Sequence, residues 1–194
     1  MPLASLSLYS RATLVLWLAC FALLAVGAKT ANRDIRVAAQ GSILSRVFKV
    51  GGMLCMFAVI YFPRLFHLPT AAANRSALIG LAGVFVCLAG VSLLMLARRS
   101  LGRNWSDLVV LKEGHQLIER GPYRWVRHPL YSGGVLGMLG SALTVGTRAA
   151  YAVVAICFVG LLVKSRQEEA LLLQQFPEYA GYKRRVKSFI PFVF

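Results

Sequence analysis

The strongest constraint on this chain is a series of apolar segments that are almost free of charge. The longest of them, Ala77–Ala97, contains no charged side chain, and a helix needs about 20 apolar residues to cross the hydrocarbon core of a bilayer. Only 15% of the 194 residues are charged, against roughly 25% in soluble domains. The sequence therefore predicts an all-α, polytopic bundle of membrane helices that forms one domain over residues 1–194.

Five segments qualify as membrane helices, although the first and the last are short for a complete span of roughly 17–25 residues. We expect the last helix to continue past Lys164 as an amphipathic helical tail. The first segment lacks the preceding basic stretch of a signal peptide, so it is interpreted as a retained helix. The five expected helices are Thr13–Ala28, Val50–Phe66, Ala77–Ala97, Pro129–Thr147 and Ala149–Val163.

The basic residues are distributed asymmetrically around these helices. Eighteen of the 22 lie between the first and second helices, between the third and fourth, or after the fifth. The positive-inside rule then predicts an N-terminus outside and a cytosolic C-terminal tail. We thus expect an integral protein of the cell membrane or an endomembrane, whose two long polar segments, Arg98–His128 and the tail from Lys164 onward, meet on the cytosolic face.

Composition and motifs argue against several classes of function. A net charge of +15 would suggest nucleic acid in a soluble protein, but charges that flank apolar segments fit anionic membrane lipids better. The four cysteines lie in apolar segments without a CxxC pair, so no metal site is predicted. The sequence also lacks a P-loop, GxGxxG, HExxH or GxSxG motif, which argues against a soluble nucleotide-binding fold.

The third polar segment, Arg98–His128, lies between the third and fourth expected helices, and its end predicts a ligand site at a helix start. Gly121-Pro122 indicates a turn, and Pro129 suits the first position of a helix, where its missing N–H costs nothing. Because the free N–H groups of a first turn attract anions, His128 and Tyr131 beside them could hold a small carboxylate. The alternative is an interfacial anchor with its aromatic side chains at headgroup depth.

Charged side chains also gather where the fifth helix leaves the membrane. Arg166 and Glu169 are three residues apart and share a helix face. An exposed salt bridge there would contribute little stability, whereas ionisable groups near a bilayer are often functional. Tyr179, Tyr182 and the basic run Lys183–Arg185 are typical of a helix that faces lipid headgroups.

Two blocks of residues between positions 115 and 191 form a recognisable pattern. The first is His115-x-Leu117-Ile118, Gly121-x-Tyr123 and Arg127-His128-Pro129-x-Tyr131-x-Gly133. The second is Arg166-x-Glu168-Glu169, Leu172, Phe176, Tyr179, Tyr182, Arg185-Val186 and Ile190-Pro191. Together they resemble the isoprenylcysteine carboxyl methyltransferase family, while the Arg-His-Pro-x-Tyr element alone also resembles phospholipid methyltransferases and membrane sterol reductases.

This resemblance implies S-adenosylmethionine as cofactor and S-adenosylhomocysteine as product, bound between the third polar segment and the tail, within residues 98–194. It also implies an acceptor site at the tail. Pro177 stands where the family usually has glycine, and the interval from Phe176 to Tyr179 is one residue short, so either Arg166 or Lys164 could take the family's substrate-arginine role. The implied cofactor residues are His115, Gln116, Leu117 and Ile118 at the adenine, Tyr123, His128, Pro129, Leu130 and Tyr131 at the amino-acid end, and Glu168; Arg166 and Glu169 would face the acceptor.

The implied reaction is methylation of a lipophilic carboxylate, above all the α-carboxyl group of a prenylcysteine, whose tail would enter from the bilayer. An ionised carboxylate needs no general base, so the protein mainly aligns the two reactants, and an arginine can hold the acceptor bidentately. Three alternatives stay open: a phospholipid or other amine N-methyltransferase with Glu169 as base, a sterol-type reductase that uses a nicotinamide cofactor, and a non-catalytic scaffold.

Overall fold

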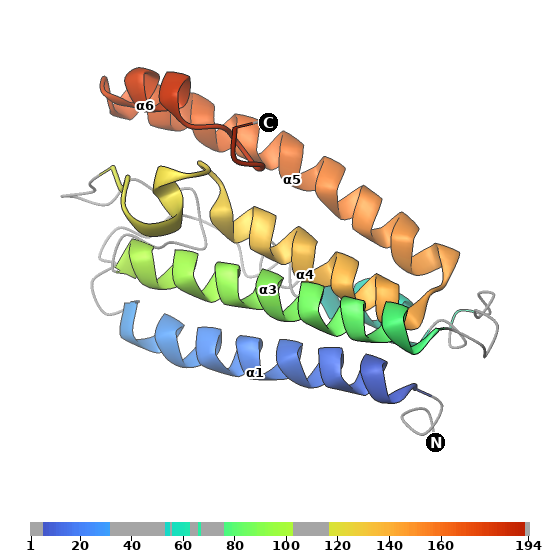
Figure 1. Cartoon of the computed structure of the whole chain (residues 1–194). Coiled ribbons are helices and arrows are strands. Elements are labelled where there is room, and N and C mark those ends of the chain that lie inside the picture. The colour runs from blue at the N-terminus through green and yellow to red at the C-terminus, as the bar shows by residue number, and fades with distance from the viewer. Residues whose placement is uncertain are drawn as a thin grey trace.

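The protein is an antiparallel bundle of long helices. The computed structural model describes residues 6–31, 53–54, 56–62, 66, 76–102 and 117–192, and within these ranges it contains helices and one isolated β-bridge. Helices α1 (Leu8–Ala31) and α3 (Ala77–Leu101) run in one direction, while α4 (Pro129–Val145) runs in the other and leads into α5 (Arg148–Gln175) (Figure 1). The short α6 (Tyr179–Arg185) follows and folds back beside the end of α5.

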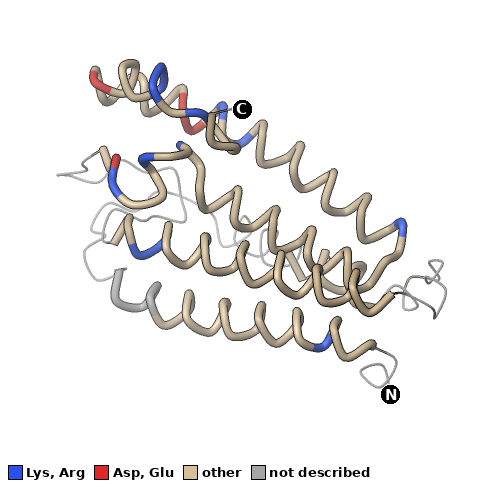
Figure 2. The backbone as a smooth tube through the Cα atoms, viewed as in Figure 1, with Lys and Arg blue, Asp and Glu red and all other residues tan. Residues whose placement is uncertain are grey.

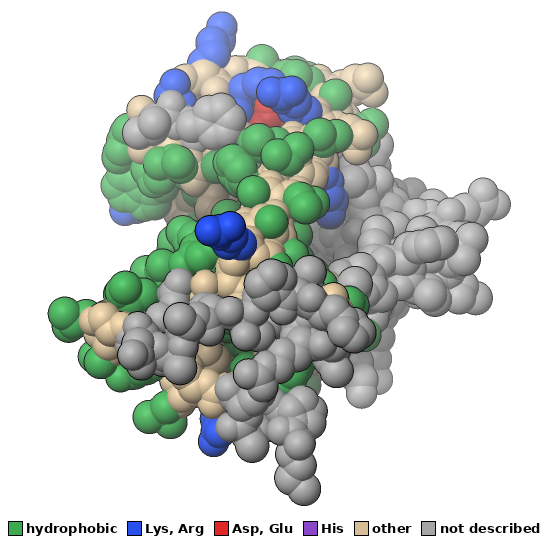
Figure 3. Space-filling view, turned by 90° about the vertical axis from the view of Figure 1, so that its right-hand side faces the viewer, with side chains coloured by type: hydrophobic (Ala, Val, Ile, Leu, Met, Phe, Trp, Pro, Cys, Tyr) green, Lys and Arg blue, Asp and Glu red, His purple; other side chains and the backbone are tan. Residues whose placement is uncertain are grey.

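Three of the described helices are long and apolar enough to cross a membrane. They are α1 over Leu8–Val26, α3 and α5, and α4 is a shorter apolar helix. Several hydrophobic side chains on α3 and α5 are well exposed, including Phe85 and Ile156, and the end-on view in Figure 3 shows hydrophobic side chains at the surface of the described part. An apolar exterior of this kind fits a lipid surrounding and confirms the prediction of a helical membrane bundle.

The helix boundaries differ in part from the predicted ones. Helix α1 begins at Leu8 rather than Thr13, whereas α4 begins at Pro129 as expected. Helix α5 continues without a break to Gln175, which confirms that the fifth helix extends past Lys164. Of the predicted helix Val50–Phe66, the structure describes residues 53–54, 56–62 and 66, of which 53–54 and 56–61 are helical. The other seven positions lie outside the described residues, so five spans remain a prediction.

Small residues let α3 and α4 approach each other closely. A Cβ atom added to Gly83 would lie 2.8 Å from the carbonyl oxygen of Gly140, and one added to Gly133 would lie 2.6 Å from the backbone nitrogen of Leu94. Such contacts are typical of membrane helices that pack through glycine. The glycine-bearing faces of α3 and α4 thus form a packing surface.

Buried polar groups join α1, the helical residues 56–61 and α4. Trp17 Nε1 donates to Ser141 Oγ at 3.0 Å, and Tyr61 Oη lies 2.8 Å from the same oxygen and 3.0 Å from Thr13 Oγ1. Hydrogen bonds between helices replace the water that is absent inside a bilayer. This network holds the bundle together near the ends of α1 and α4 that lie away from α6 (Figure 1).

The charged groups lie mainly at the other end of the bundle. All four described acidic residues are found there, on the segment before α4, in the last turns of α5 and immediately before α6 (Figure 2). The third polar segment and the tail therefore meet, as the sequence predicted. Their meeting point is the candidate site.

Candidate functional site

The tail pairs directly with the segment that leads into α4. The 3₁₀ turn Gly121–Arg124 precedes this segment. The backbone N–H of Arg127 donates to the carbonyl of Lys187 at 2.8 Å, and that of His128 donates to the carbonyl of Ser188 at 3.0 Å. A parallel β-bridge between Val126 and Lys187 continues the pairing. Residues about 60 positions apart in the chain thus form one wall of the site.

Helix α6 packs against this wall through its tyrosines. Tyr179 and Tyr182 are buried together with Phe176 and Val186, so the prediction that they face lipid headgroups is wrong. Tyr182 Oη donates to the carbonyl of Tyr123 at 2.6 Å. Burial, with some help from nearby acidic groups, raises the pKa of Tyr182 well above its usual range, so the phenol remains a neutral donor.

The start of α4 carries an aromatic stack. His128 is the N-cap residue and is buried, and its ring lies nearly parallel to that of Tyr131, with 5.5 Å between ring centroids. Phe189 from the tail stacks on both rings, at 5.7 Å from His128 and 6.4 Å from Tyr131. Phe158 of α5 meets Phe189 edge-on at 5.7 Å. The stack joins α4, α5 and the tail.

The backbone at this helix start is less open than the sequence suggested. The N–H groups of Tyr131 and Ser132 both donate to the carbonyl of His128 at 3.0 Å. Of the three N–H positions after Pro129, two are therefore engaged within the turn. The predicted helix start is confirmed, but its capacity to bind an anion through backbone groups is smaller than expected.

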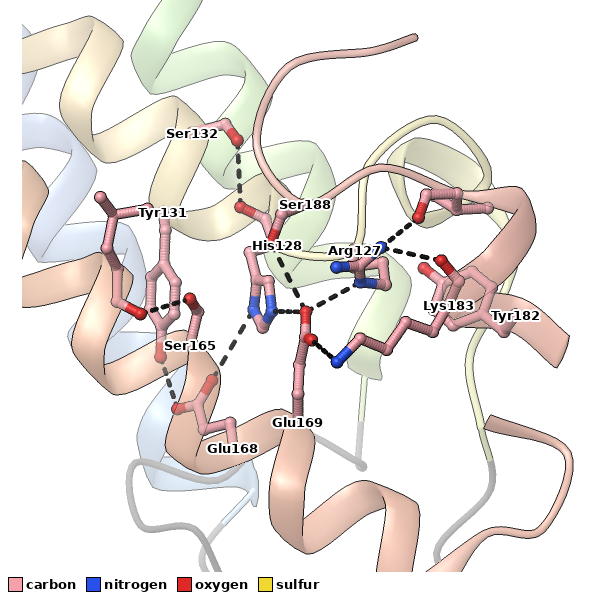
Figure 4. A network of polar contacts seen from close by, with 12 residues as sticks. Arg127, His128, Tyr131, Ser132, Ser165, Glu168, Glu169, Tyr182, Lys183 and Ser188 are labelled. Carbon is pink, nitrogen blue, oxygen red and sulfur yellow. Dashed lines mark hydrogen bonds and ion pairs between the residues drawn. The ribbon is translucent and has the colours of Figure 1, made fainter. Parts of the chain in front are cut away.

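Glu169 lies at the centre of the polar contacts (Figure 4). Its Oε1 atom accepts from Arg127 Nε at 2.8 Å and lies 3.0 Å from His128 Nε2, while Oε2 lies 2.8 Å from Lys183 Nζ. Ser188 Oγ is a further, longer contact at 3.4 Å. The Glu169 side chain is only 7% exposed, and contacts of this kind hold a carboxylate in its ionised form.

Glu168 forms a second cluster one residue earlier on α5. Tyr131 Oη donates to Glu168 Oε1 at 2.5 Å, and Lys164 Nζ lies 3.8 Å from the same oxygen. His128 Nδ1 lies 3.8 Å from Glu168 Oε2. Lys164 Nζ also sits 5.3 Å from the centroid of the Tyr131 ring. The imidazole of His128 therefore stands between the two carboxylates, as Figure 4 shows.

The structure brings several of the predicted site residues together, while others lie near the site or outside the described residues. His128, Tyr131, Glu168 and Glu169 converge. His115 and Gln116 lie outside the described residues. The remaining predicted cofactor residues are near the same end of the bundle: Leu117 packs on the α6 cluster, Tyr123 and Pro129 are buried, and Ile118 and Leu130 are half-buried.

The structure does not pair Arg166 with Glu169, the salt bridge that the sequence left open as an alternative. Arg166 is exposed, and the cations that contact Glu169 among the described residues are Arg127 and Lys183, with the His128 ring as a further partner. Helical geometry separates Lys164 and Arg166 by about 200° around α5. Lys164 is thus on the flank that faces Glu168 and Tyr131, and Arg166 is on the opposite flank.

Sequence reasoning missed three contributors to this site. Lys183 was assigned to a headgroup-facing run, and Ser188 and Phe189 drew no attention. Their positions depend on how the tail folds back over α4, which no local pattern encodes. Arg127 belonged to the quoted motif, and its place beside His128 was the one available signal of a role in the site.

Comparisons with known proteins relate part of the chain to one family. A model of the isoprenylcysteine carboxyl methyltransferase family matches residues 81–174. The cobalt-zinc-cadmium resistance protein CzcN of Cupriavidus metallidurans is 36% identical over 94 residues, which are 47% of this chain and 44% of that protein. The protein-S-isoprenylcysteine O-methyltransferase of Rattus norvegicus is 28% identical over 116 residues, which are 58% of this chain and 41% of the rat protein.

The fold also matches a solved structure. The eukaryotic intramembrane Ras methyltransferase aligns with a TM-score of 0.57 and 21% identity, covering 94% of this chain and 68% of that one. The chain spans less than half the length of the two curated relatives named above. The matched region contains most of α3, the segment before α4, α4 itself and almost all of α5. Through this region, which is just under half of the chain, the protein is similar to the isoprenylcysteine carboxyl methyltransferase family.

Proposed function

We propose that this protein transfers a methyl group from S-adenosylmethionine to the carboxylate of a lipophilic acceptor of the prenylcysteine type. The observation that carries the proposal is the convergence of His128, Tyr131 and Glu168 from two segments about 40 positions apart. These are residues that the family resemblance assigns to the cofactor. The name of the rat relative, a protein-S-isoprenylcysteine O-methyltransferase, supports the choice of acceptor.

The residues present fit such a cofactor. Glu168 is a partly exposed carboxylate that can accept from an ammonium group, and the rings of His128 and Tyr131 offer flat apolar faces beside it. The cofactor supplies an activated methyl group and its own leaving group. The protein then has to hold the two reactants in line and exclude water from them.

The state of Glu169 favours a carboxylate acceptor over an amine. Methylation of an amine requires a base that removes a proton. Glu169 was the predicted base for that reaction, but its two oxygens are held by Arg127, Lys183 and His128. A carboxylate engaged in this way is a poor proton acceptor. A carboxylate acceptor is already ionised and needs no such group.

For the cation that orients the acceptor, the geometry favours Lys164 over Arg166. Lys164 Nζ lies beside Glu168 and above the Tyr131 ring, whereas Arg166 is exposed on the other flank of α5. A lysine offers a point charge in place of the planar fork of an arginine. It can still hold an acceptor carboxylate next to the cofactor residues.

We further propose five membrane spans, with the N-terminus outside and the site at the cytosolic face. The 18-to-4 distribution of basic residues supports this orientation. The ends of α1 and α3 and the start of α4 all lie at the end of the bundle that holds the site (Figure 1), as this topology requires.

Binding of S-adenosylhomocysteine to the purified full chain in lipid nanodiscs tests the proposed function. Calorimetric titration should give saturable binding, and a screen of acceptors should then show methylation of prenylated thiol acids but not of lipid amines. An absence of binding would refute the cofactor. Binding followed by methylation of amines alone would refute the acceptor class.

A further inference from the structure

We infer that Glu169 is a positioning residue: together with Arg127 and Lys183 it clamps the C-terminal segment, residues 186–189, onto the start of α4. This clamp would set the shape of the cofactor site, so the inference rests on the proposed function. The resemblance assigned Glu169 to the acceptor instead. The contacts of Glu169 in the structure point to the different role.

The first argument is that one carboxylate joins three parts of the chain. Glu169 lies on α5, Arg127 precedes α4, and Lys183 lies on α6. Both cations approach to 2.8 Å, one at each carboxylate oxygen. A buried carboxylate without its partners would strongly destabilise the folded protein. These contacts are therefore expected to persist as long as the site is folded.

The second argument is that Arg127 extends the clamp to the backbone of the tail. Its Nη1 atom donates to the carbonyl of Lys183 at 3.1 Å and to the carbonyl of Val186. These carbonyls lie at the end of α6, where carbonyl groups lack partners within the helix and a cation is favourable. One guanidinium thus binds Glu169 and the α6 terminus together.

The third argument is what the clamped segment does at the site. The carbonyls of Lys187 and Ser188 accept from the backbone of Arg127 and His128, and the carbonyl of Phe189 accepts from Ser132 Oγ at 2.7 Å. Phe189 is thereby placed on the His128–Tyr131 stack. Loss of the clamp should free Phe189 and open the wall beside the proposed cofactor residues.

The test uses Lys183→Met in the full chain in nanodiscs. Arg184→Met is the matched control, because it also removes one positive charge from an exposed side chain of α6. The first readout is hydrogen exchange of the Arg127 and His128 amides, which donate to tail carbonyls. The second is the affinity for S-adenosylhomocysteine, and the third compares KM for S-adenosylmethionine with kcat.

We expect Lys183→Met to speed exchange of these amides and weaken S-adenosylhomocysteine binding by about 10-fold each, as loss of one charged contact implies. KM should rise while kcat at saturation changes little, and Arg184→Met should match the wild type. In a Glu169→Gln background Lys183→Met should have no further effect, because the two residues act as a unit. Lys183→Arg should restore both the slow amide exchange and the affinity for S-adenosylhomocysteine.

Unchanged amide exchange in Lys183→Met would overturn the clamp. Faster exchange with unchanged cofactor affinity would overturn its link to the site. Should Glu169→Gln fail to fold, Lys183→Arg decides the matter, because a variant that keeps the charge but behaves like Lys183→Met refutes the mechanism. Failure of the wild type to bind S-adenosylhomocysteine would refute the proposed function, while the exchange measurement would still test the clamp.

Discussion

Replacement of Lys164 by methionine separates the two candidates for the cation that orients the acceptor. Methionine keeps most of the length and apolar stem of the side chain but removes the charge. The Lys164 side chain is 43% exposed and its ammonium group is 3.8 Å from Glu168. An ion pair with this exposure contributes about 0–1 kcal/mol to stability. Lys164→Met should therefore shift the melting temperature by only a few degrees.

The expected effect on turnover is much larger. If Lys164 holds the acceptor carboxylate in line with the methyl group, its loss leaves the nucleophile free to move, and a misplacement of about 1 Å can cost on the order of 10²-fold in rate. We expect Lys164→Met to reduce methylation of a prenylated thiol acid by about that factor. S-adenosylhomocysteine affinity, measured by calorimetry, should stay within a few-fold of the wild type.

Arg166→Met tests the alternative hypothesis, that Arg166 orients the acceptor carboxylate. Arg166 is exposed on the far flank of α5, so its loss should reduce the rate by much less than that of Lys164. A collapse of turnover in Arg166→Met with normal activity in Lys164→Met would refute the reasoning from helix geometry. Arg184→Met controls for the loss of one positive charge at an exposed position of the tail.

Three further predictions follow from the structure. His128→Ala should weaken S-adenosylhomocysteine binding by about 1.5–3 kcal/mol, the loss of a charged hydrogen bond; unchanged affinity in calorimetry would contradict the placement of the cofactor. Gly90→Ala puts a Cβ atom 2.7 Å from the carbonyl oxygen of Gly133 and should destabilise the bundle by about 1–3 kcal/mol, whereas Gly134→Ala, which meets nothing within 4 Å, should leave thermal unfolding unchanged. Reporter fusions at the two termini should place them on opposite sides of the membrane, and termini on the same side would refute the five-span topology.

Features that depend on local chemistry could be predicted from the sequence. Pro129 marks the start of α4 because proline has no N–H and a fixed φ. Glycines spaced along α3 and α4 predict close helix contact because the absence of side chains is what such contact needs. The extension of α5 past Lys164 follows from a helical pattern that no proline or glycine interrupts before Gln175.

The partners of Glu169 could not be predicted in the same way. Arg127 and Lys183 are 42 and 14 residues away from it in the chain, and Arg166 was the nearest available cation on the same helix face. Tyr182 and Lys183 also fit an interfacial helix, because the residue types that anchor a helix at headgroups are those that fill a polar site. Only the path of the tail over α4 distinguishes the two interpretations.

The fate of a labelled methyl group tests the central claim most directly. The full chain in nanodiscs would be given S-adenosylmethionine with an isotopically labelled methyl group, together with a prenylated thiol acid. Carboxyl methylation predicts label in the lipid-soluble product that mild base releases as methanol, because a methyl ester is hydrolysed under those conditions. Label that resists base, or no transfer of label, would contradict the account.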